Sequence, residues 1–199
     1  MKTQTNNHPL KKYPVIGACG LDCGLCPRFH SGGEKPCPGC CGEGFWDRHP
    51  SCPFITCAVN QRGLESCGEC NELEFCPKVL KNLEGAKRRD SFLSYKTLSG
   101  NLENTRRHGH KQVADKLKER IDFLRLLIGD YNDGRSKAFY CLSVQLLPLD
   151  KMRATLSRVR ELITPDTAKN DIAKMVREGF LSLAGELGVD LKLRTGKTD

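Results

Sequence analysis

Eleven of the twelve cysteines of this 199-residue chain lie between Cys19 and Cys76. The same stretch has few side chains that could build a core. Residues 13–77 hold twelve Leu, Ile, Val and Phe among sixty-five positions, together with ten of the nineteen glycines. A segment so poor in apolar residues buries too little surface to fold by itself. Bound metal would supply the missing free energy, about 10–16 kcal/mol for a structural zinc. We therefore expect a small, irregular, metal-stapled module here.

The spacing of these cysteines is typical of metal ligands. Three Cys-Xaa-Xaa-Cys units recur, and two intervening residues allow both sulfurs to face one cation. Glycine next to each pair relieves the tight turn, and two pairs complete the tetrahedral site that zinc prefers. The predicted metal ligands are Cys19, Cys23, Cys26, Cys37, Cys40, His49, Cys52, Cys57, Cys67, Cys70 and Cys76.

The cellular compartment favours metal over disulfides. The first dozen residues contain no apolar stretch of signal-peptide length, and the longest apolar run is shorter than a membrane span. We therefore expect a cytoplasmic protein, in which reducing conditions keep thiols free for metal. Two or three zinc ions are favoured. An iron–sulfur cluster is the alternative, because four of the cysteines precede proline as in a ferredoxin run, although the compact ferredoxin spacing is absent.

Several residues leave the ligand assignment open. His49 stands in a His-Xaa-Xaa-Cys unit with Cys52 and is a candidate because imidazole replaces thiolate readily at zinc. Cys41 is the weakest candidate, since it directly follows Cys40 and adjacent residues seldom reach the same ion. We expect His30 to be a surface residue. The grouping of the cysteines into sites is not determined by their order. Cys141, far from the others, is expected to be a small buried hydrophobe.

The second half of the chain has helical periodicity, and an α-helical bundle is the expected assembly. Helices are expected around residues 92–102, 113–128, 138–147, 152–163 and 172–187. We expect Asp90 or Ser91, Asp150, and Thr164 with Pro165 to begin three of them, and Gly129 and Gly188 to end two. Composition thus divides the chain into a flexible N-terminus (1–12), a cysteine-rich metal-binding module (13–80), a helical bundle (81–190) and a loose basic tail (191–199).

The charge of the second half bears on partners. Residues 81–199 hold 24 Lys and Arg against 16 Asp and Glu, which accounts for the whole net charge of +8. The basic clusters at 87–89 and 105–111 could bind nucleic-acid phosphates, but interspersed acidic residues are typical of solvated helix faces. No phosphate loop, nucleophile elbow or paired-carboxylate motif is present, so no catalytic residue is predicted.

In its cysteine pattern the chain resembles the prokaryotic proteins grouped as domain of unknown function 3795. The stretches that carry the likeness are CGLDCGLCP, CPGC and CPFITCAVNQRGLESCGEC, followed by Cys76, and the helical part resembles the longer members. This resemblance implies a metal-binding module and no particular reaction. The expected function is a binding or adaptor protein with structural zinc sites and an unknown protein partner. The alternatives are an iron–sulfur protein for electron transfer or redox sensing, and a nucleic-acid-binding protein.

Overall fold

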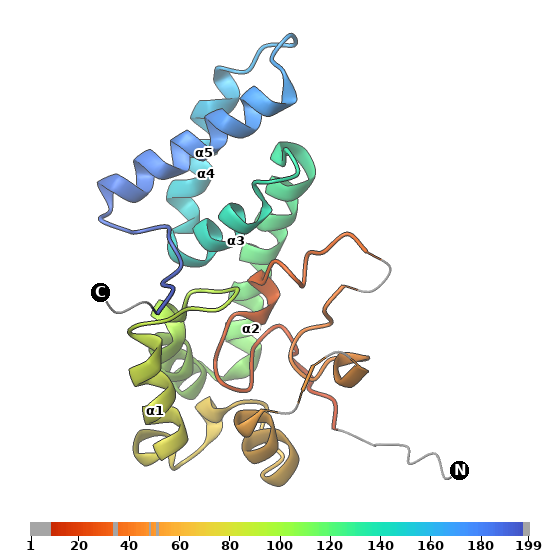
Figure 1. Ribbon diagram of the computed structural model, residues 1–199, viewed down its shortest axis with the longest axis vertical. Helices are drawn as coiled ribbons and strands as arrows, with labels where there is room; N and C mark the ends of the chain where they lie inside the picture. Colours follow the sequence, from red (N-terminus) through yellow and green to blue (C-terminus); the bar gives the residue numbers. More distant parts are fainter. Residues whose placement is uncertain (1–8, 34–35, 48, 51, 197–199) are drawn as a thin grey trace.

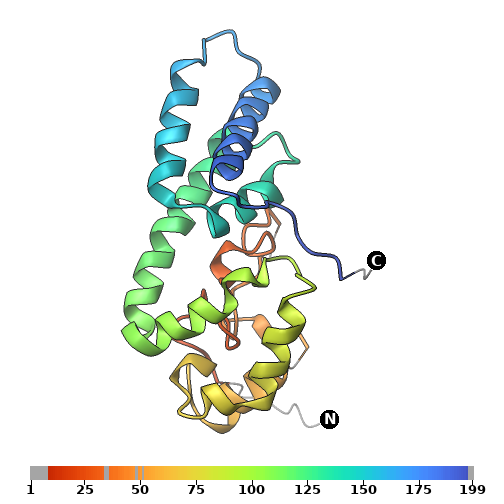
Figure 2. The same cartoon turned by 90° about the vertical axis from the view of Figure 1, so that its left-hand side faces the viewer.

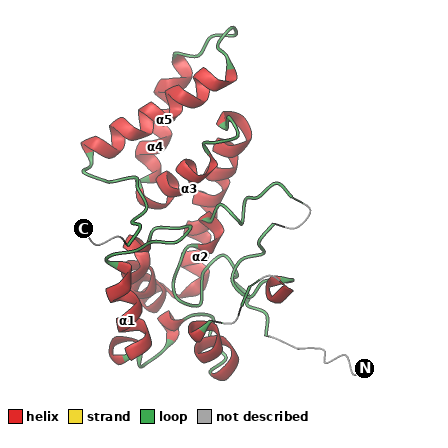
Figure 3. Cartoon of the chain, viewed as in Figure 1, coloured by secondary structure: helices red, strands yellow, loops and turns green. Residues whose placement is uncertain are grey.

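The computed structural model describes residues 9–33, 36–47, 49–50 and 52–196. The molecule is elongated, with the cysteine-rich coil and α1 at one end and the helical pair α4 and α5 at the other (Figure 1). The described residues form five α-helices, which are α1 (Pro77–Ala86), α2 (Leu98–Tyr131), α3 (Lys137–Leu146), α4 (Leu149–Glu161) and α5 (Lys169–Glu186). Within the described residues there is no β-strand, only an isolated bridge between Arg89 and Thr195 (Figure 3). The prediction of an irregular cysteine-rich region followed by an all-α region is confirmed.

The cysteine-rich region consists of loops and short helical turns. The turns are Cys23–Leu25, Phe45–Asp47, Cys67–Glu69 and Leu73–Phe75, which are 3₁₀-helical, and Ile55–Gln61, which is π-helical. Helix α1 follows with Pro77 at its first position, where a fixed φ and a missing N–H cost nothing. Glycines and prolines break the longer periodic runs in this region, and α1 is the first α-helix of the described residues.

Helix α2 is the longest element and connects the two ends of the molecule. It contacts α1, α3 and α5 as well as two of the cysteine turns, Cys23–Leu25 and Cys67–Glu69. It is bent at Gly109, whose φ of 73° and ψ of 162° are not helical, a backbone conformation that glycine adopts without strain. The two arms on either side of the bend are visible in Figure 2. The amphipathic helix predicted around 113–128 is the second arm, which continues past Gly129 to Tyr131.

One main core joins the cysteine-rich region to the helices. It includes Ile121 and Leu124 of α2, Tyr140 of α3 and Phe180 of α5, and Leu25 of the cysteine-rich region enters it fully buried. The apolar segment 138–147 is indeed a buried helix, and Cys141 is only 1% exposed within it. Complete burial of a leucine side chain stabilises a fold by about 1.5–3 kcal/mol. The cysteine-rich region therefore gains apolar stabilisation from the helices, which composition alone did not indicate. No helix in the described part of the chain is both long and apolar enough to cross a membrane.

The predicted helix starts are wrong at three places. The expected start at Asp90 or Ser91 instead lies in a non-helical connection, and α2 begins only at Leu98 after a 3₁₀ turn. Helix α4 begins before Asp150, with Pro148 as its N-cap. Helix α5 begins at Lys169, because the backbone N–H of Thr164 bonds the hydroxyl of Thr167 at 2.9 Å and closes a separate turn. The end of α5 is as predicted, since Gly188 follows with a φ of 63°.

Both chain ends are more firmly held than the sequence indicates. Lys11 is buried, and its backbone N–H donates to the carbonyl of Cys41 at 3.0 Å. In the tail, Arg194 binds the buried carboxylate of Asp90 through its guanidinium group at 2.7 Å and through its backbone N–H at 2.7 Å. The predicted loose tail is thus wrong for residues 191–196. Residues 1–8 and 197–199, which complete the two predicted terminal segments, lie outside the described residues.

Substitution of Asp90 by asparagine should release this tail and lower the free energy of unfolding by about 1–2 kcal/mol at pH 7. Burial alone raises the pKa of Asp90, but the hydrogen bonds from Arg194 and from the N–H of Tyr95 outweigh it and lower the pKa. A lowered folded-state pKa stabilises the fold above the unfolded pKa of about 3.9, and the contribution disappears as the pH falls through the folded value.

Urea unfolding at pH 7 and at pH 3 measures this effect. The difference between wild type and Asp90→Asn should shrink markedly at the lower pH. Asp115→Asn is the control, because Asp115 forms only an exposed pair with Lys111 and should matter little. Equal stability of wild type and Asp90→Asn at pH 7 would contradict the anchoring role.

Candidate metal centre

Two of the Cys-Xaa-Xaa-Cys units have the same backbone structure. In each, the N–H of the second cysteine donates to the carbonyl of the first, at 3.1 Å for Cys26 to Cys23 and at 3.1 Å for Cys70 to Cys67. Each forms a 3₁₀ turn that ends with the second cysteine in an extended conformation. Both units have the sequence Cys-Gly-Xaa-Cys. The chain therefore builds the same cysteine turn twice.

The glycine of each turn lies directly against helix α2. A Cβ atom on Gly24 would lie 2.4 Å from the Cδ1 of Ile121, on the second arm of the helix. A Cβ atom on Gly68 would lie 2.8 Å from the Cβ of Thr105 and 3.0 Å from the carbonyl oxygen of Leu102, on the first arm. Contacts this short leave no room for a side chain unless the neighbouring atoms shift. The two glycines thus allow the cysteine turns to dock on α2, one on each side of its bend.

Four cysteines line one small cavity beside the second turn. They are Cys57 of the π-helical turn, Cys67 and Cys70 of the cysteine turn, and Cys76 at the start of α1. The cavity volume is about 30 Å³, which is room for a single water-sized guest. We call these four residues the C4 group. The loops bring them together from positions nineteen residues apart in the sequence, which no single Cys-Xaa-Xaa-Cys motif could do.

The thiols of the C4 group influence each other electrostatically. Burial, together with the smaller effects of the charges of Cys19, Cys76, Cys57 and Cys70, raises the pKa of Cys67 to about 12. On the rim, the guanidinium of Arg62 donates to the sulfur of Cys70 at 3.3 Å. Without a cation the inner thiol is therefore held neutral, and a bound divalent ion would favour the thiolate.

A second group of cysteines surrounds Cys40. Burial raises the pKa of Cys19 to about 12, with further contributions from the charges of Cys40 and Cys52. A hydrogen bond from the thiol of Cys41 lowers the pKa of Cys40 to about 6. Backbone N–H groups also face these sulfurs, from Ala18 to Cys40 at 3.3 Å and from Ile55 to Cys52 at 3.4 Å. Such N–H donors stabilise thiolates, as metal-bound cysteines require.

The remaining predicted ligand residues lie at the edge of this second group. The Nε2 atom of His49 is 3.4 Å from the sulfur of Cys37. In the structure His49 therefore lies beside Cys37, whereas the sequence spacing pairs it with Cys52. The imidazole stacks on the ring of Phe45 with centroids 4.4 Å apart. Cys26 lies close enough to Cys37 for their charges to interact. These residues form pairs rather than a four-ligand set.

Cys41 and His30, the two residues whose role as metal ligands the sequence leaves open, have other partners. Cys41 is fully buried and adopts a positive φ of 56°, and it forms the thiol hydrogen bond to Cys40 described above. His30 is half-buried rather than on the surface, since its Nε2 lies 2.8 Å from the carbonyl oxygen of Gly24. Burial lowers the pKa of His30. His30 therefore supports the first cysteine turn, whereas Cys41 supports the thiolate of Cys40.

Across the described part of the chain, no three or more His, Cys, Asp or Glu side chains are close enough together to hold a metal ion. The four thiols of the C4 group line a common cavity but are not drawn in to ligand distance. All twelve cysteines are free thiols. The donor chemistry thus fits zinc or an iron–sulfur cluster, and binding would require the thiols to close on the ion.

Comparison with protein-family models, curated proteins and solved structures gives no match to this chain. The resemblance to domain of unknown function 3795 accordingly stays a prediction.

Proposed function

We propose that this chain is a zinc-binding protein in which a structural ion is held by the C4 group, Cys57, Cys67, Cys70 and Cys76. The observation that supports the proposal best is that these four thiols line one cavity of atomic size. Four sulfur ligands are the usual set of a closed structural zinc site. An ion so enclosed has no open position for a substrate, so its role would be to fix the loops around it.

A second ion would use the group around Cys40. Cys19, Cys23, Cys40 and Cys52 are four thiols whose charges interact there, and N–H donors already face two of them. The two ions would then bind on the two cysteine turns that dock on α2. The fold would present α2 and its neighbours as a rigid surface for a protein partner, which is the adaptor role expected from the sequence.

The two basic clusters give little support to nucleic-acid binding. In the first cluster, Lys87 lies 2.6 Å from the carboxylate of Glu84. In the second, Arg107 lies 2.5 Å from Glu103, and Lys111 lies 2.8 Å from Asp115. Since these cations already have neighbouring carboxylates, they form mixed-charge helix faces rather than a phosphate-binding patch.

Cobalt substitution tests the proposed zinc site. Protein freed of metal under anaerobic, reducing conditions should bind Co²⁺ and develop the intense visible and near-ultraviolet absorption of tetrahedral cobalt thiolate. Zinc should then displace the cobalt and abolish the colour. In Cys70→Ser the bands should weaken, whereas Cys141→Ser should give the wild-type spectrum. A spectrum of octahedral cobalt without sulfur charge-transfer bands in the wild type would contradict the proposal.

A further inference from the structure

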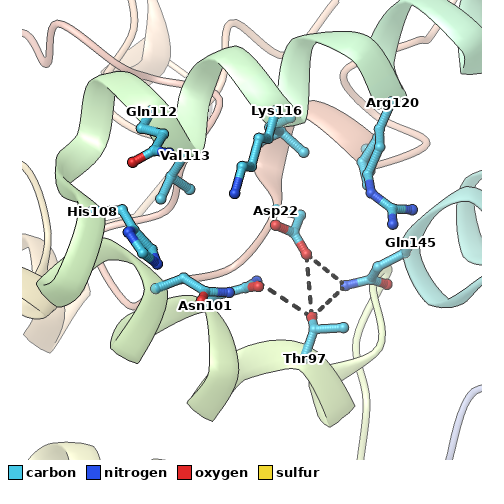
Figure 4. A pocket seen from close by; sticks show the side chains of 12 residues that line it. Asp22, Thr97, Asn101, His108, Gln112, Val113, Lys116, Arg120 and Gln145 are labelled. Atoms are coloured by element: carbon cyan, nitrogen blue, oxygen red, sulfur yellow. Dashed lines mark hydrogen bonds between the residues drawn. The ribbon is translucent and has the colours of Figure 1, made fainter. Parts of the chain in front are cut away.

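A polar cavity of the described residues lies between the two arms of α2. Its volume is about 270 Å³, just below the lower end of the range for small-molecule sites. Because α2 bends at Gly109, both arms contribute to the walls (Figure 4). The lining residues are Asp22, Leu25, Thr97, Asn101, Asn104, His108, Gln112, Val113, Lys116, Leu117, Arg120 and Gln145. No cysteine is among them.

A hydrogen-bond network fixes one carboxylate at the floor of this cavity. The Oδ2 atom of Asp22 accepts from the hydroxyl of Thr97 at 3.2 Å and from the side-chain amide of Gln145 at 3.3 Å. Gln145 is 6% exposed and is itself held by the backbone of Ser94, with two bonds of 2.9 Å. Asn101 donates to Thr97 at 3.4 Å. The carboxylate is therefore preorganised.

The other carboxylate oxygen is available to a guest. The hydroxyl of Thr97 and the amide of Gln145 both bind the Oδ2 atom of Asp22, so neither of these two donors occupies its Oδ1 atom. A carboxylate removed from water without a full set of donors is costly unless a donor or cation arrives. This oxygen is suited to accept hydrogen bonds from a ligand ammonium group.

Positive charge faces the carboxylate from the second arm of α2. The side chains of Lys116 and Arg120 point into the cavity in Figure 4. The Nη1 of Arg120 is bound to the carbonyl oxygens of Val144 and Leu147, which leaves its other N–H groups for a ligand. Lys116 forms no ion pair or hydrogen bond within the described residues, whereas its neighbour Lys118 on the outer face pairs with Asp122 at 2.9 Å.

Besides the carboxylate and the two cations, the cavity has a small apolar surface. Leu25 and Leu117 are buried, and Val113 is half-buried beside them. They form the apolar part of a lining that also contains Asp22, Lys116 and Arg120. A guest that satisfies all three surfaces carries an ammonium group, a carboxylate and a short apolar portion. We propose that this cavity binds a free α-amino acid with a short side chain.

In this arrangement the ligand ammonium would bind Asp22, its carboxylate would bind Lys116 and Arg120, and its side chain would contact the leucines. Neither charged half of the ligand would be left without a partner, which is the condition for burying charge in a cavity. The exposed amides of Asn104 and Gln112 at the mouth complete the polar rim.

Isothermal titration of the full chain with L-alanine, L-serine and L-valine, each alone, tests this inference. Saturable binding of at least one of these amino acids is expected. Propionate, ethylamine and N-acetyl-L-alanine, each titrated alone, should not bind. Lys116→Gln should weaken the binding about tenfold or more, while Lys118→Gln should leave it unchanged. Asp22→Asn, checked for unchanged metal content, should also abolish it.

Three results would overturn the inference. They are the absence of saturable binding of all three amino acids to the wild type, equal binding of propionate or inorganic phosphate, and unchanged affinity in Lys116→Gln. Metal content and cobalt spectra are independent of these titrations, so failure here would leave the zinc proposal standing.

Discussion

Replacement of Cys67 by serine is expected to remove one metal ion and to lower the melting temperature by more than about 10 °C. Cys67 is the most enclosed thiol of the C4 group, being 7% exposed and surrounded by the charges of three other members. A structural zinc contributes about 10–16 kcal/mol to a small module, and each kcal/mol lost shifts the melting temperature of a chain of this size by about 2–4 °C.

Calorimetry and elemental analysis of the same preparations measure this effect. Cys141→Ala is the matched control, because Cys141 is also a buried free thiol but lies in α3 and belongs to neither of the two proposed ligand sets. It should lose only packing and retain all metal. If Cys67→Ser kept its metal and its melting temperature, the C4 group would not be a ligand set.

Adding one methyl group to each cysteine turn is the second large perturbation. Gly24→Ala and Gly68→Ala should each lower the free energy of unfolding by about 1–3 kcal/mol, because the new Cβ would overlap buried atoms of α2. Their contacts on the helix are sixteen residues apart, at Ile121 and Thr105, and distant sites act nearly independently. The double variant should therefore lose about 2–6 kcal/mol.

Gly100→Ala is the control for this pair. Gly100 is also in α2, but a Cβ atom there would meet no neighbour within 4 Å. Since alanine is the better helix former, this variant should be slightly more stable than the wild type, by about 0.5–1 kcal/mol. Denaturant unfolding of the wild type and the four variants measures these differences in stability. Wild-type stability in the double variant would show that the turns do not dock on α2 as described.

Periodicity predicted much of the helical half. The apolar residues of 113–128 and 138–147 predict α2 and α3 because burial along one face, or all round, determines those helices. The helix starts were predicted less well, since Asp90 binds Arg194, which is distant in sequence, and that long-range ion pair competes with a local capping role. The bend at Gly109 was also not predicted, because a glycine inside a helical pattern does not by itself indicate a positive φ.

For the candidate sites, too, the local features were predictable from the sequence and the long-range neighbours were not. Cysteine spacing identifies the residue type and the paired turns, because two intervening residues impose a local geometry. It does not reveal that Cys57 and Cys76 line the same cavity as Cys67 and Cys70, because loop closure between separate turns creates that neighbourhood. The polar cavity beside Asp22 gave no sequence signal at all. Its residues come from four separate segments, and they meet only because α2 bends around them.

The metal content of the untreated protein tests the central claim most directly. Elemental analysis of protein purified without added metal or chelator, with an absorption spectrum recorded anaerobically, should give at least about one zinc per chain in a colourless solution. A brown protein with iron and sulfide would assign the cysteines to a cluster instead. A well-folded, reduced protein that contains no transition metal would contradict the account.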